Sequence, residues 1–496
     1  MSHHLPVPLY TAHQVRELDR IAIQDCGIPG IKLMKRAGYA VFQQLISRWP
    51  GAPVTVLCGA GNNGGDGYIV AALAAESCLS VEVIQLAPAE KLRGDALLAY
   101  NYALQAGVSI KRFSDGMGLT TGVVVDALLG TGLTGPVREP FAQAISLIND
   151  SGLPVVSVDI PSGLCSDTGT AAGPVVEADV TVTFIGLKQG LFTGAGPQHT
   201  GELLFDNLRV PEVVYHQIQP ECERLVLDEL LPLLPKRRRD AHKGDFGHVL
   251  VVGGELGFGG AVAMAAEAAL RTGAGLVSVA TRPEHVSALL SRCPELMVNA
   301  VSSGQALLPL LERASVVVVG PGLGKTPWSE QLLRQVLMMG KPTVVDADGL
   351  NLLAAQPSKT PDSQHWILTP HPGEAARLLG KTVTEVQSDR FSAVRELWKK
   401  YQCPVLLKGA GSLICHSNKL PVAVCSGGNP GMASGGMGDV LSGITGALLA
   451  QGIDPGQALS LAVGLHAEAA DRAAVDGERG MVATDLLGPL RRLVNP

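Results

Sequence analysis

The stretch SGGMGDVLSGI, residues 434–444, places an acid where an anion site is expected. Its glycines precede the apolar run VLSGITGALLA, which predicts a helix, and a glycine-rich turn at a helix N-terminus presents unpaired N–H groups to an anion. Asp439 would repel a bound phosphate, so it needs another role. It either caps the helix or acts as a general base that deprotonates an acceptor hydroxyl while residues 435–438 hold a migrating phosphoryl group. We expect the second role.

Other loops of the second half carry groups suited to the same chemistry. TPHPGE follows an apolar run and contains His371 and Glu374, whereas LKGAGS offers the cation of Lys408 and the hydroxyl of Ser412. A lone histidine is often only packed and a lysine only solvated, so both interpretations stay open for His371 and Lys408. The glycine turns of this half lack GxxxxGK followed by Ser or Thr, so they do not form a P-loop.

The first half contains a GxGxxG pattern directly after the apolar run VTVLC, at Gly59, Gly61 and Gly64. A Rossmann dinucleotide site also needs an acid at the end of the next strand, about 20 residues on. The next run, VEVIQLA, offers only Gln85, which weakens that interpretation. The loop instead continues as NNGGDG, and a purely structural turn rarely combines two Asn, one Asp and four Gly.

Three later strand ends of the first half share this oxygen-rich character. VVVDALLGTGLTGP supplies Asp126, VVSVDIPSG supplies Asp159 and Ser162, and TFIGLKQG supplies Lys188. Either aspartate alone is equally consistent with a cap of the turn that follows it. Together with Asn63 they would form an oxygen cage for a cation beside an acid and a lysine.

The elements that must position these residues are strands and helices in alternation. Short apolar runs rich in β-branched residues alternate with helical stretches in both halves, which predicts parallel sheets covered on both faces. The pattern lapses between about 207 and 243, where Pro and charged residues gather. Domains usually hold about 100–200 residues, and we expect two here, at 1–220 and 221–496. The basic run at 236–239 is either a binding patch or, more simply, a solvated linker face.

Composition excludes several functions. The net charge of −6 disfavours nucleic acid as a partner, and nine scattered Cys without a CxxC pair indicate reduced thiols and no zinc site. The N-terminus lacks an apolar signal core, and no apolar run approaches the roughly 18 residues that span a membrane. A soluble cytoplasmic enzyme is expected.

The motifs of the first half resemble the N-terminal domain of the NAD(P)HX epimerases, which repair hydrated nicotinamide cofactors. The resemblance rests on GNNGGDG, DALLGTGLTG, VDIPSG and GLKQG. It implies that Asn63, Asp126 and Ser162 coordinate K⁺ and that Asp159 contacts the substrate near the reacting ring. We expect Asp159, with Lys188 nearby, to handle the protons as hydroxide leaves and returns. The substrate-binding residues that it implies are Asn62, Asn63, Gly64, Gly65, Asp66, Gly130, Thr131, Gly132, Leu133, Thr134, Gly135, Pro136, Asp159 and Lys188.

The second half resembles the ribokinase-like superfamily, whose signature is a Gly-x-Gly-Asp anion hole, here Gly436 to Asp439. HKGDFGHVLVVGG, GPGLG, DADGLN, TPHPGE and LKGAGS narrow the match to the NAD(P)H-hydrate dehydratases. The resemblance implies Mg²⁺ as cofactor, although His371-Pro-Gly-Glu374 replaces the frequent Asn-x-x-Glu magnesium motif. It assigns the hydrated cofactor to Ala261, Gly322, His371 and Asp439, and ADP to Lys408, Gly409, Ala410, Gly411, Ser412 and Gly438.

The two resemblances together span nearly the whole chain, in the order found in the bacterial bifunctional repair enzymes. They imply an α/β protein of two three-layer α/β/α domains, an N-terminal Rossmann-like domain and a C-terminal ribokinase-like domain. The expected partners are the small molecules NADHX, NADPHX and ADP, with no nucleic acid and no membrane, in a homo-oligomer.

Two other functions share part of this pattern. A ribokinase-like kinase of a small alcohol would share the anion hole and Asp439, but it would leave a stable phosphorylated product. N-terminal domains of this kind also occur as interaction modules of messenger-RNA decapping scaffolds, where the chemistry is lost. The retained set of Asn63, Asp126, Asp159 and Ser162 argues against such a loss here.

Overall fold

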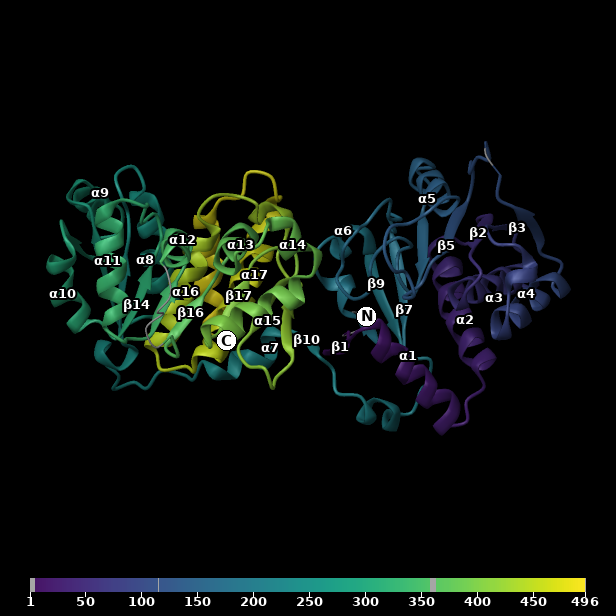
Figure 1. Ribbon diagram of the computed structural model, residues 1–496, viewed down its shortest axis with the longest axis horizontal. Helices are drawn as coiled ribbons and strands as arrows, with labels where there is room; N and C mark the ends of the chain where they lie inside the picture. The colour runs from purple at the N-terminus through teal and green to yellow at the C-terminus, as the bar shows by residue number, and fades with distance from the viewer. Residues whose placement is uncertain (1–4, 115, 357–362, 496) are drawn as a thin grey trace. The chain divides into compact units, whose positions relative to one another are not determined.

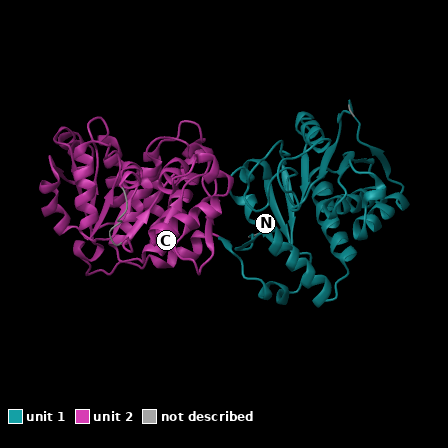
Figure 2. Ribbon diagram, in the orientation of Figure 1, with its two compact units in different colours: residues 1–223 teal, residues 224–496 magenta. Residues whose placement is uncertain are grey.

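The structure is a computed structural model that describes residues 5–114, 116–356 and 363–495. The chain divides into two compact units, residues 1–223 and 224–496, which Figure 2 colours separately. Among the described residues, no helix is long and apolar enough to cross a membrane.

Unit 1 is built on a parallel sheet with the strand order β4-β3-β2-β5-β6-β7-β9. Its strands are β2 (Val54–Cys58), β3 (Val81–Gln85), β4 (Ser109–Arg112), β5 (Val123–Ala127), β6 (Val155–Val158), β7 (Val180–Phe184) and β9 (Glu202–Asp206). The chain adds β3 and β4 on one side of β2 and the later strands on the other, so the order reverses between β2 and β5. Ligands of open α/β sheets bind outside the carboxyl ends of the strands at such a reversal.

Helices cover both faces of this sheet, as the three-layer prediction requires (Figure 1). Val56 packs into a core with α2, α3 and α4, whereas its neighbour Leu57 packs into a core with α5 on the opposite face. The helices are α1 (Ala12–Arg20), α2 (Gly30–Arg48), α3 (Asn62–Glu76), α4 (Gly94–Gln105), α5 (Phe141–Asp150) and α6 (Gly196–Thr200), with a π-helical turn, η1 (Ile21–Asp25), after α1.

Unit 2 contains a second, mixed sheet, in which the order β13-β12-β11-β14-β15-β16-β17-β18-β19 again reverses once, between β11 and β14. Pairing is parallel from β13 to β17 and antiparallel beyond. The strands are β11 (His248–Val252), β12 (Leu276–Thr281), β13 (Met297–Ala300), β14 (Val316–Val319), β15 (Thr343–Val345), β16 (Trp366–Leu368), β17 (Val405–Leu407), β18 (Ser412–Cys415) and β19 (Val422–Cys425).

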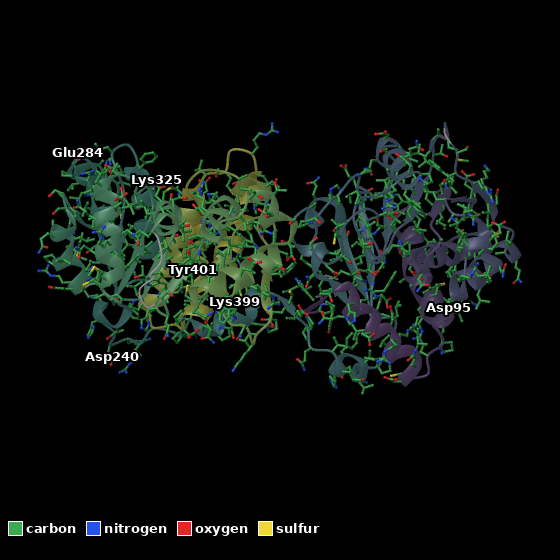
Figure 3. The ribbon with its side chains drawn as sticks, viewed as in Figure 1. Asp95, Asp240, Glu284, Lys325, Lys399 and Tyr401 are labelled. Carbon is green, nitrogen blue, oxygen red and sulfur yellow. The ribbon has the colours of Figure 1, made fainter. Side chains whose placement is uncertain are left out.

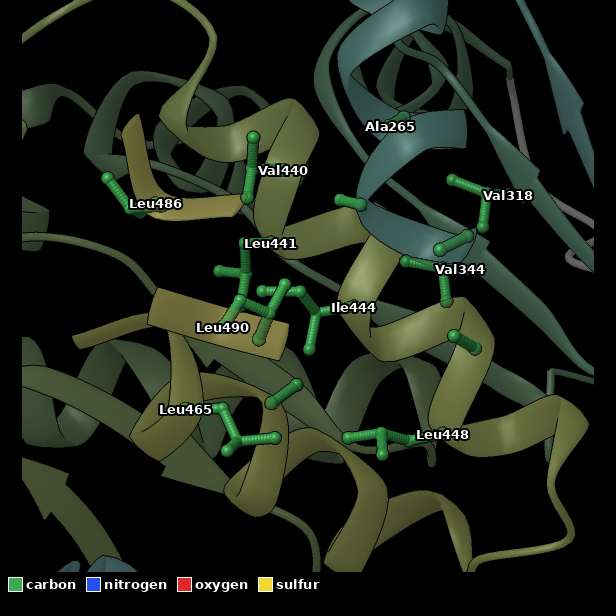
Figure 4. Packing of buried hydrophobic residues seen from close by; sticks show 14 of the residues in the cluster. Ala265, Val318, Val344, Val440, Leu441, Ile444, Leu448, Leu465, Leu486 and Leu490 are labelled. Carbon is green, nitrogen blue, oxygen red and sulfur yellow. The ribbon is translucent and has the colours of Figure 1, made fainter. Parts of the chain in front are cut away.

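The core of unit 2 surrounds α16, which is apolar on nearly every side because it lies inside the unit. Figure 4 shows Leu441, Ile444 and Leu448 of α16 near Leu465 and Leu490. A Cβ on Gly443 would lie 2.0 Å from the Ala265 carbonyl oxygen, so this glycine lets α8 and α16 pack closely. The helices are α7 (Leu227–Leu230), α8 (Gly259–Thr272), α9 (Val286–Arg292), α10 (Gly304–Arg313), α11 (Pro327–Met338), α12 (Ala347–Ala355), α13 (Pro372–Leu379), α14 (Val383–Ser388), α15 (Arg390–Tyr401), α16 (Met437–Ala450), α17 (Pro455–Ala473) and α18 (Leu487–Leu493).

The segment GNNGGDG forms the start of helix α3, whereas the sequence predicts a loop there. Glycine is a poor helix former, but these glycines permit close packing. A Cβ on Gly64 would lie 2.2 Å from the carbonyl oxygen of Gly59, and one on Gly67 would lie 2.5 Å from the Ala127 side chain. Tertiary packing therefore overrides local propensity at this site.

Candidate active sites

Unit 1 contains a cavity of about 610 Å³ at the carboxyl ends of β2, β5, β6 and β7. Of the epimerase residues predicted from sequence, it is lined by Asn62, Asn63, Asp66, Gly130 to Thr134, Asp159 and Lys188. Gly64, Gly65, Gly135 and Pro136 do not line it. Gly65 instead allows contact between helices, because a Cβ there would lie 2.6 Å from Cε of Met34.

Asp159 and Lys188 form a buried ion pair at the floor of this cavity. The Lys188 side chain is 1% exposed and that of Asp159 is 17% exposed. The Lys188 ammonium donates to Asp159 Oδ1, to Thr183 Oγ1 at 3.0 Å and to the Phe184 carbonyl oxygen at 3.0 Å. Asp159 has φ +67°, a left-handed conformation that non-glycine residues rarely adopt and that is often found at functional sites. The pair is therefore held rigidly, with the carboxylate toward the cavity.

Asp126 lies beneath the cavity, in the central strand β5. Its carboxylate accepts hydrogen bonds from the Ser157 hydroxyl at 2.9 Å and from the Ser162 amide at 2.8 Å and hydroxyl at 2.5 Å. Burial raises the pKa of Asp126, and these hydrogen bonds oppose the rise. Asn63 Nδ2 donates to the Leu129 carbonyl oxygen at 3.0 Å, and its Oδ1 is buried without a hydrogen-bond partner. The three predicted potassium ligands thus meet around one loop, and one of them offers an unused oxygen.

Two acids at this cavity were not predicted from the sequence. Asp19, on α1, lines it, and burial together with the negative charge of Asp159 raises the pKa of Asp19 to about 6, against the opposing effect of Lys188. Asp95, labelled in Figure 3, projects from α4, and a Cβ on Gly30 would lie 2.1 Å from its Oδ2. The spacing of Val15, Asp19 and Ile23, four residues apart, is the only sequence signal that places Asp19 on the same helix face as two apolar residues.

The turn before α16 in unit 2 has the geometry expected of an anion site. The helix N-cap is Gly436, at φ +93° and without a side-chain cap, and Asp439 lies within the first helical turn. The capping interpretation of Asp439 is therefore wrong. Burial, reinforced by the charges of Asp346 and Asp348, raises the pKa of Asp439 to about 7, although Lys408 opposes the rise. A carboxyl with such a pKa can exchange protons at neutral pH.

Lys408 makes an ion pair with Asp346, an acid that the sequence motif DADGLN contains but for which no role was predicted. Lys408 Nζ lies 2.7 Å from Asp346 Oδ1, and the Ser442 hydroxyl of α16 donates to Asp346 Oδ2 at 2.7 Å. Burial alone would raise the pKa of Asp346, but the charge and hydrogen bond of Lys408 outweigh it and the pKa is lowered. A Cβ on Gly438 would lie 3.3 Å from Lys408 Nζ, so the ammonium lies beside this glycine turn.

His371 and Glu374 start helix α13 as a reciprocal cap. The His371 amide donates to Glu374 Oε2 at 2.8 Å, while His371 Nδ1 accepts from the Gly373 amide at 3.0 Å. Burial raises the pKa of Glu374 to about 7 even though Lys408 opposes it. Burial, with the positive charges of Lys408 and Arg377, lowers the pKa of His371. The half-exposed histidine thus has a structural role, and its neutral ring also faces the Lys408 cluster.

The remaining predicted residues of unit 2 fall into two groups. Ala261 and Gly322 are adjacent, since a Cβ on Gly322 would lie 3.0 Å from that of Ala261. Lys325, labelled in Figure 3, follows the Gly322 turn. In the same turn the Gly324 amide donates a hydrogen bond to Asp348, and the charge of Asp348 also raises the pKa of Asp439.

The second group is the loop 408–412, to which the buried Arg390 is hydrogen-bonded. Arg390 donates to the carbonyl oxygens of Leu407, Lys408 and Gly411 at 3.3 to 3.4 Å. The sequence did not predict this contact, because Arg390 lies on a separate helix, α15. Among the described residues, no group of three or more His, Cys, Asp or Glu side chains is arranged to hold a metal ion.

Comparisons with known proteins agree with this division into two sites. The family described as YjeF-related protein N-terminus matches residues 30–190, and the family described as NAD(P)H-hydrate dehydratase matches residues 249–492. A bifunctional NAD(P)H-hydrate repair enzyme from Coxiella burnetii is 50% identical over 490 residues, which cover 98% of this chain and 99% of that protein. The bifunctional NAD(P)H-hydrate repair enzyme from Escherichia coli is 44% identical, and the match covers 99% of this chain and 95% of that protein. A solved ribokinase-like superfamily protein from Enterococcus faecalis has a TM-score of 0.51 at 30% identity, covering 55% of this chain and 94% of its own.

Proposed function

The chain belongs to the family of bifunctional NAD(P)H-hydrate repair enzymes, and we propose that each of its units catalyses one step of that repair. Unit 1 interconverts the R and S epimers of NADHX and NADPHX, and unit 2 dehydrates the S epimer to the reduced cofactor with ADP. One observation carries this proposal: the same chain holds a buried Asp159–Lys188 pair in one cavity and Asp439 at a glycine anion turn. The full-length relatives favour this function over a small-alcohol kinase fused to an interaction module.

In unit 1 the reacting group is the hydroxyl at C6 of the nicotinamide ring. Asp159 Oδ1 is held by Lys188, Thr183 and the Phe184 amide, which fixes the carboxylate at the cavity floor. We assign Asp159 a role in the proton transfers that accompany departure and return of this hydroxyl. The N–H groups at the start of α3 and the loop 130–136 hold the phosphates of the cofactor.

Potassium fits the oxygen atoms beside this cavity. The free Oδ1 of Asn63, the Asp126 carboxylate and the Ser162 hydroxyl are oxygen donors, which suit a hard cation. The bound ion would supply a positive charge near the substrate phosphates and offset the burial of Asp126. Loop 130–136 would be ordered by the same ion, since Asn63 and Ser162 both bond to Leu129 just before it.

In unit 2 the reaction is an elimination that proceeds through phosphorylation. The Asp439 carboxylate removes the proton of the C6 hydroxyl, whose oxygen attacks the terminal phosphoryl group of ADP and releases AMP. The N–H groups of the Gly436–Gly438 turn stabilise the charge on the transferring group. Inorganic phosphate then leaves C6 under push from the ring nitrogen, C5 loses its proton to solvent, and the C5=C6 bond of the reduced nicotinamide is restored.

The ADP phosphates are assigned to Lys408, the loop 409–412 and Gly438, and the hydrated cofactor to Ala261, Gly322, His371 and Asp439. Mg²⁺ typically uses one or two carboxylates together with substrate phosphates and water. Glu374, whose charge acts on Lys408, is the proposed protein contact, and the ion would neutralise the ADP phosphates. Homo-oligomeric assembly stays a prediction, which light scattering tests.

The deciding assay follows reduced-nicotinamide absorbance when the chain is mixed with NADHX, Mg²⁺, K⁺ and either ADP or ATP. We expect recovery of NADH together with stoichiometric AMP and phosphate from ADP. A stable phosphorylated product without NADH would instead indicate the kinase function. Stabilisation by RNA but not by ADP or NADH in a thermal shift assay would indicate a scaffold.

A further inference from the structure

Helix α1 and the turn after it form one wall of the unit 1 cavity. Val15, Asp19 and Ile23, spaced by four residues, all line it. The π-helical turn η1 begins directly after α1, closed by a hydrogen bond of 3.0 Å from the Cys26 amide to the Ile21 carbonyl oxygen. Such turns are frequent at functional sites. The first strand, β1 (Pro8–Tyr10), pairs with β8 (Leu187–Lys188), so α1 starts beside Lys188.

The charges around Asp19 are unbalanced. The Lys188 ammonium already donates to Asp159, Thr183 and Phe184, which uses its three protons. Burial raises the pKa of Asp66 well above its ordinary value, and the negative charges of Asp159 and Asp19 add to the rise. The ionisable groups that face or act on Asp19 are Arg16 on its own helix, Asp66 on α3, Asp95 on α4, Asp159 after β6, Lys188 on β8 and Tyr215.

Four carboxyl groups, those of Asp19, Asp66, Asp95 and Asp159, therefore share a cavity with Arg16 and with one lysine whose ammonium is already engaged. Asp19 and Asp159 differ in how they are held. Asp159 is fixed by three donors, the Lys188 ammonium, the Thr183 hydroxyl and the Phe184 amide. Asp19, which faces the cavity from the helical wall, receives no such pairing, and like charges close together cannot all ionise. The cavity carboxyls whose pKa is raised are thus Asp19 on α1 and Asp66 on α3.

We propose that Asp19 is a second acid–base residue of the epimerase, which works opposite Asp159 on the same C6 centre. This inference rests on the function proposed for unit 1. Inversion at C6 requires hydroxyl to leave from one face of the ring and water to add to the other. One carboxyl cannot serve both faces, whereas carboxyls on the helical wall and at the strand ends can.

The ring nitrogen lone pair forms an N1=C6 bond as the C6–O bond breaks, and the departing oxygen takes the Asp19 proton and leaves as water. Water then adds to the opposite face, the N1=C6 pair returns to nitrogen, and Asp159 takes the released proton. Reversal exchanges the two roles, and solvent resets the two carboxyls, because neither Asp19 nor Asp159 is fully buried.

The test uses the full chain with Asp19→Asn, and Glu17→Gln, at a partly exposed position of the same helix, as control. Epimerisation of NADHX is followed by chromatography over a range of pH. We expect Asp19→Asn to lower epimerase kcat by about 100-fold or more with KM little changed, and to abolish the decline of the wild-type rate as pH rises above about 6. Dehydration of S-NADHX by unit 2 should be unaffected, and Glu17→Gln should behave as wild type.

Asp19→Glu separates chemistry from packing, because it retains a carboxyl, and should recover part of the rate and the alkaline decline. Asp19→Asn with the wild-type rate and pH profile would overturn the proposal. The proposal would also be overturned if Asp19→Glu were as inactive as Asp19→Asn and its residual rate kept the wild-type pH profile. A wild-type chain that does not accelerate epimerisation at all would instead overturn the function proposed for unit 1.

Discussion

Lys408 Nζ and Asp346 Oδ1 lie 2.7 Å apart at the carboxyl edge of the unit 2 sheet. The pair joins the ends of β15 and β17, and the Ser442 hydroxyl connects it to α16. The opposite charge lowers the pKa of Asp346 against its burial and raises that of Lys408 against its burial, so both stay ionised. In the proposed function, Lys408 would therefore meet ADP as a cation already oriented by a buried acid.

Removing Lys408 leaves the buried Asp346 carboxylate without its partner. We expect Lys408→Met to destabilise unit 2 by about 3 kcal/mol and to weaken ADP binding, as measured by calorimetric unfolding and titration. Lys419→Met, at an exposed turn, is the matched control and should change neither. The double variant Lys408→Met with Asp346→Leu should recover stability but not ADP binding. Full stability of the single variant would contradict the buried pair.

Asp439 should control the pH dependence of dehydration. A general base must be ionised, so the dehydratase kcat should rise with pH through about 7, the pKa to which burial raises Asp439. Asp439→Asn should lower kcat by about 100-fold or more, keep ADP binding in titration calorimetry, and leave epimerisation intact. Glu478→Gln, on the exposed surface, is the control. Turnover retained in Asp439→Asn would rule out its role as base.

The same raised pKa has the opposite effect on stability. Folding raises the pKa of Asp439 from 3.8 to about 7, so the folded state binds more protons between these values. The free energy of unfolding therefore falls as pH rises through this range and levels off above it. The asparagine of Asp439→Asn cannot ionise, so this variant should melt several degrees above wild type at pH above 7. Each kcal/mol of added stability raises the melting temperature by about 2–4 °C. The difference should vanish below pH 4, and a constant difference at all pH would contradict the assignment.

The sequence predicts the sheets and the loops at their carboxyl ends, because apolar runs and the turns after them are local patterns. The α/β fold class and the repair function are confirmed. Other contacts depend on distant segments. Lys408 and Asp346 are 62 residues apart and meet only through the strand order β15-β16-β17. Asp19 faces the cavity because α1 packs beside Lys188, and no local pattern reports that packing.

Asn63 should make the rate of epimerisation, but not the rate of dehydration, depend on potassium. Its buried Oδ1 has no hydrogen-bond partner in the structure, and a cation would coordinate this oxygen. Replacing K⁺ by a bulky organic cation should slow epimerisation by wild type and leave the rate of S-NADHX dehydration unchanged. Asn63→Ala should show the low rate at every K⁺ concentration. A K⁺ response preserved in Asn63→Ala would place the ion elsewhere.

Gly436 should tolerate no side chain. Its φ of +93° disfavours other residues, and a Cβ would lie 2.5 Å from the Met264 sulfur. Gly436→Ala should therefore displace the anion-binding turn and lower dehydratase kcat by at least tenfold, about the effect of losing part of one oxyanion donor. Gly435→Ala, where a Cβ meets nothing within 4 Å, is the neighbouring control. Equal activity of both variants would argue against a role of this turn in holding the phosphoryl group.

An epimer-resolved assay tests the central claim of two sites in one chain most directly. A mixture of R- and S-NADHX is treated with ADP, Mg²⁺ and K⁺, and NADH formation is followed to completion. Wild type should convert both epimers, Asp159→Ala should convert only the S fraction and then proceed at the uncatalysed epimerisation rate, and Asp439→Asn should convert neither. Conversion of both epimers at the wild-type rate by Asp159→Ala, or by Asp439→Asn, would contradict the account.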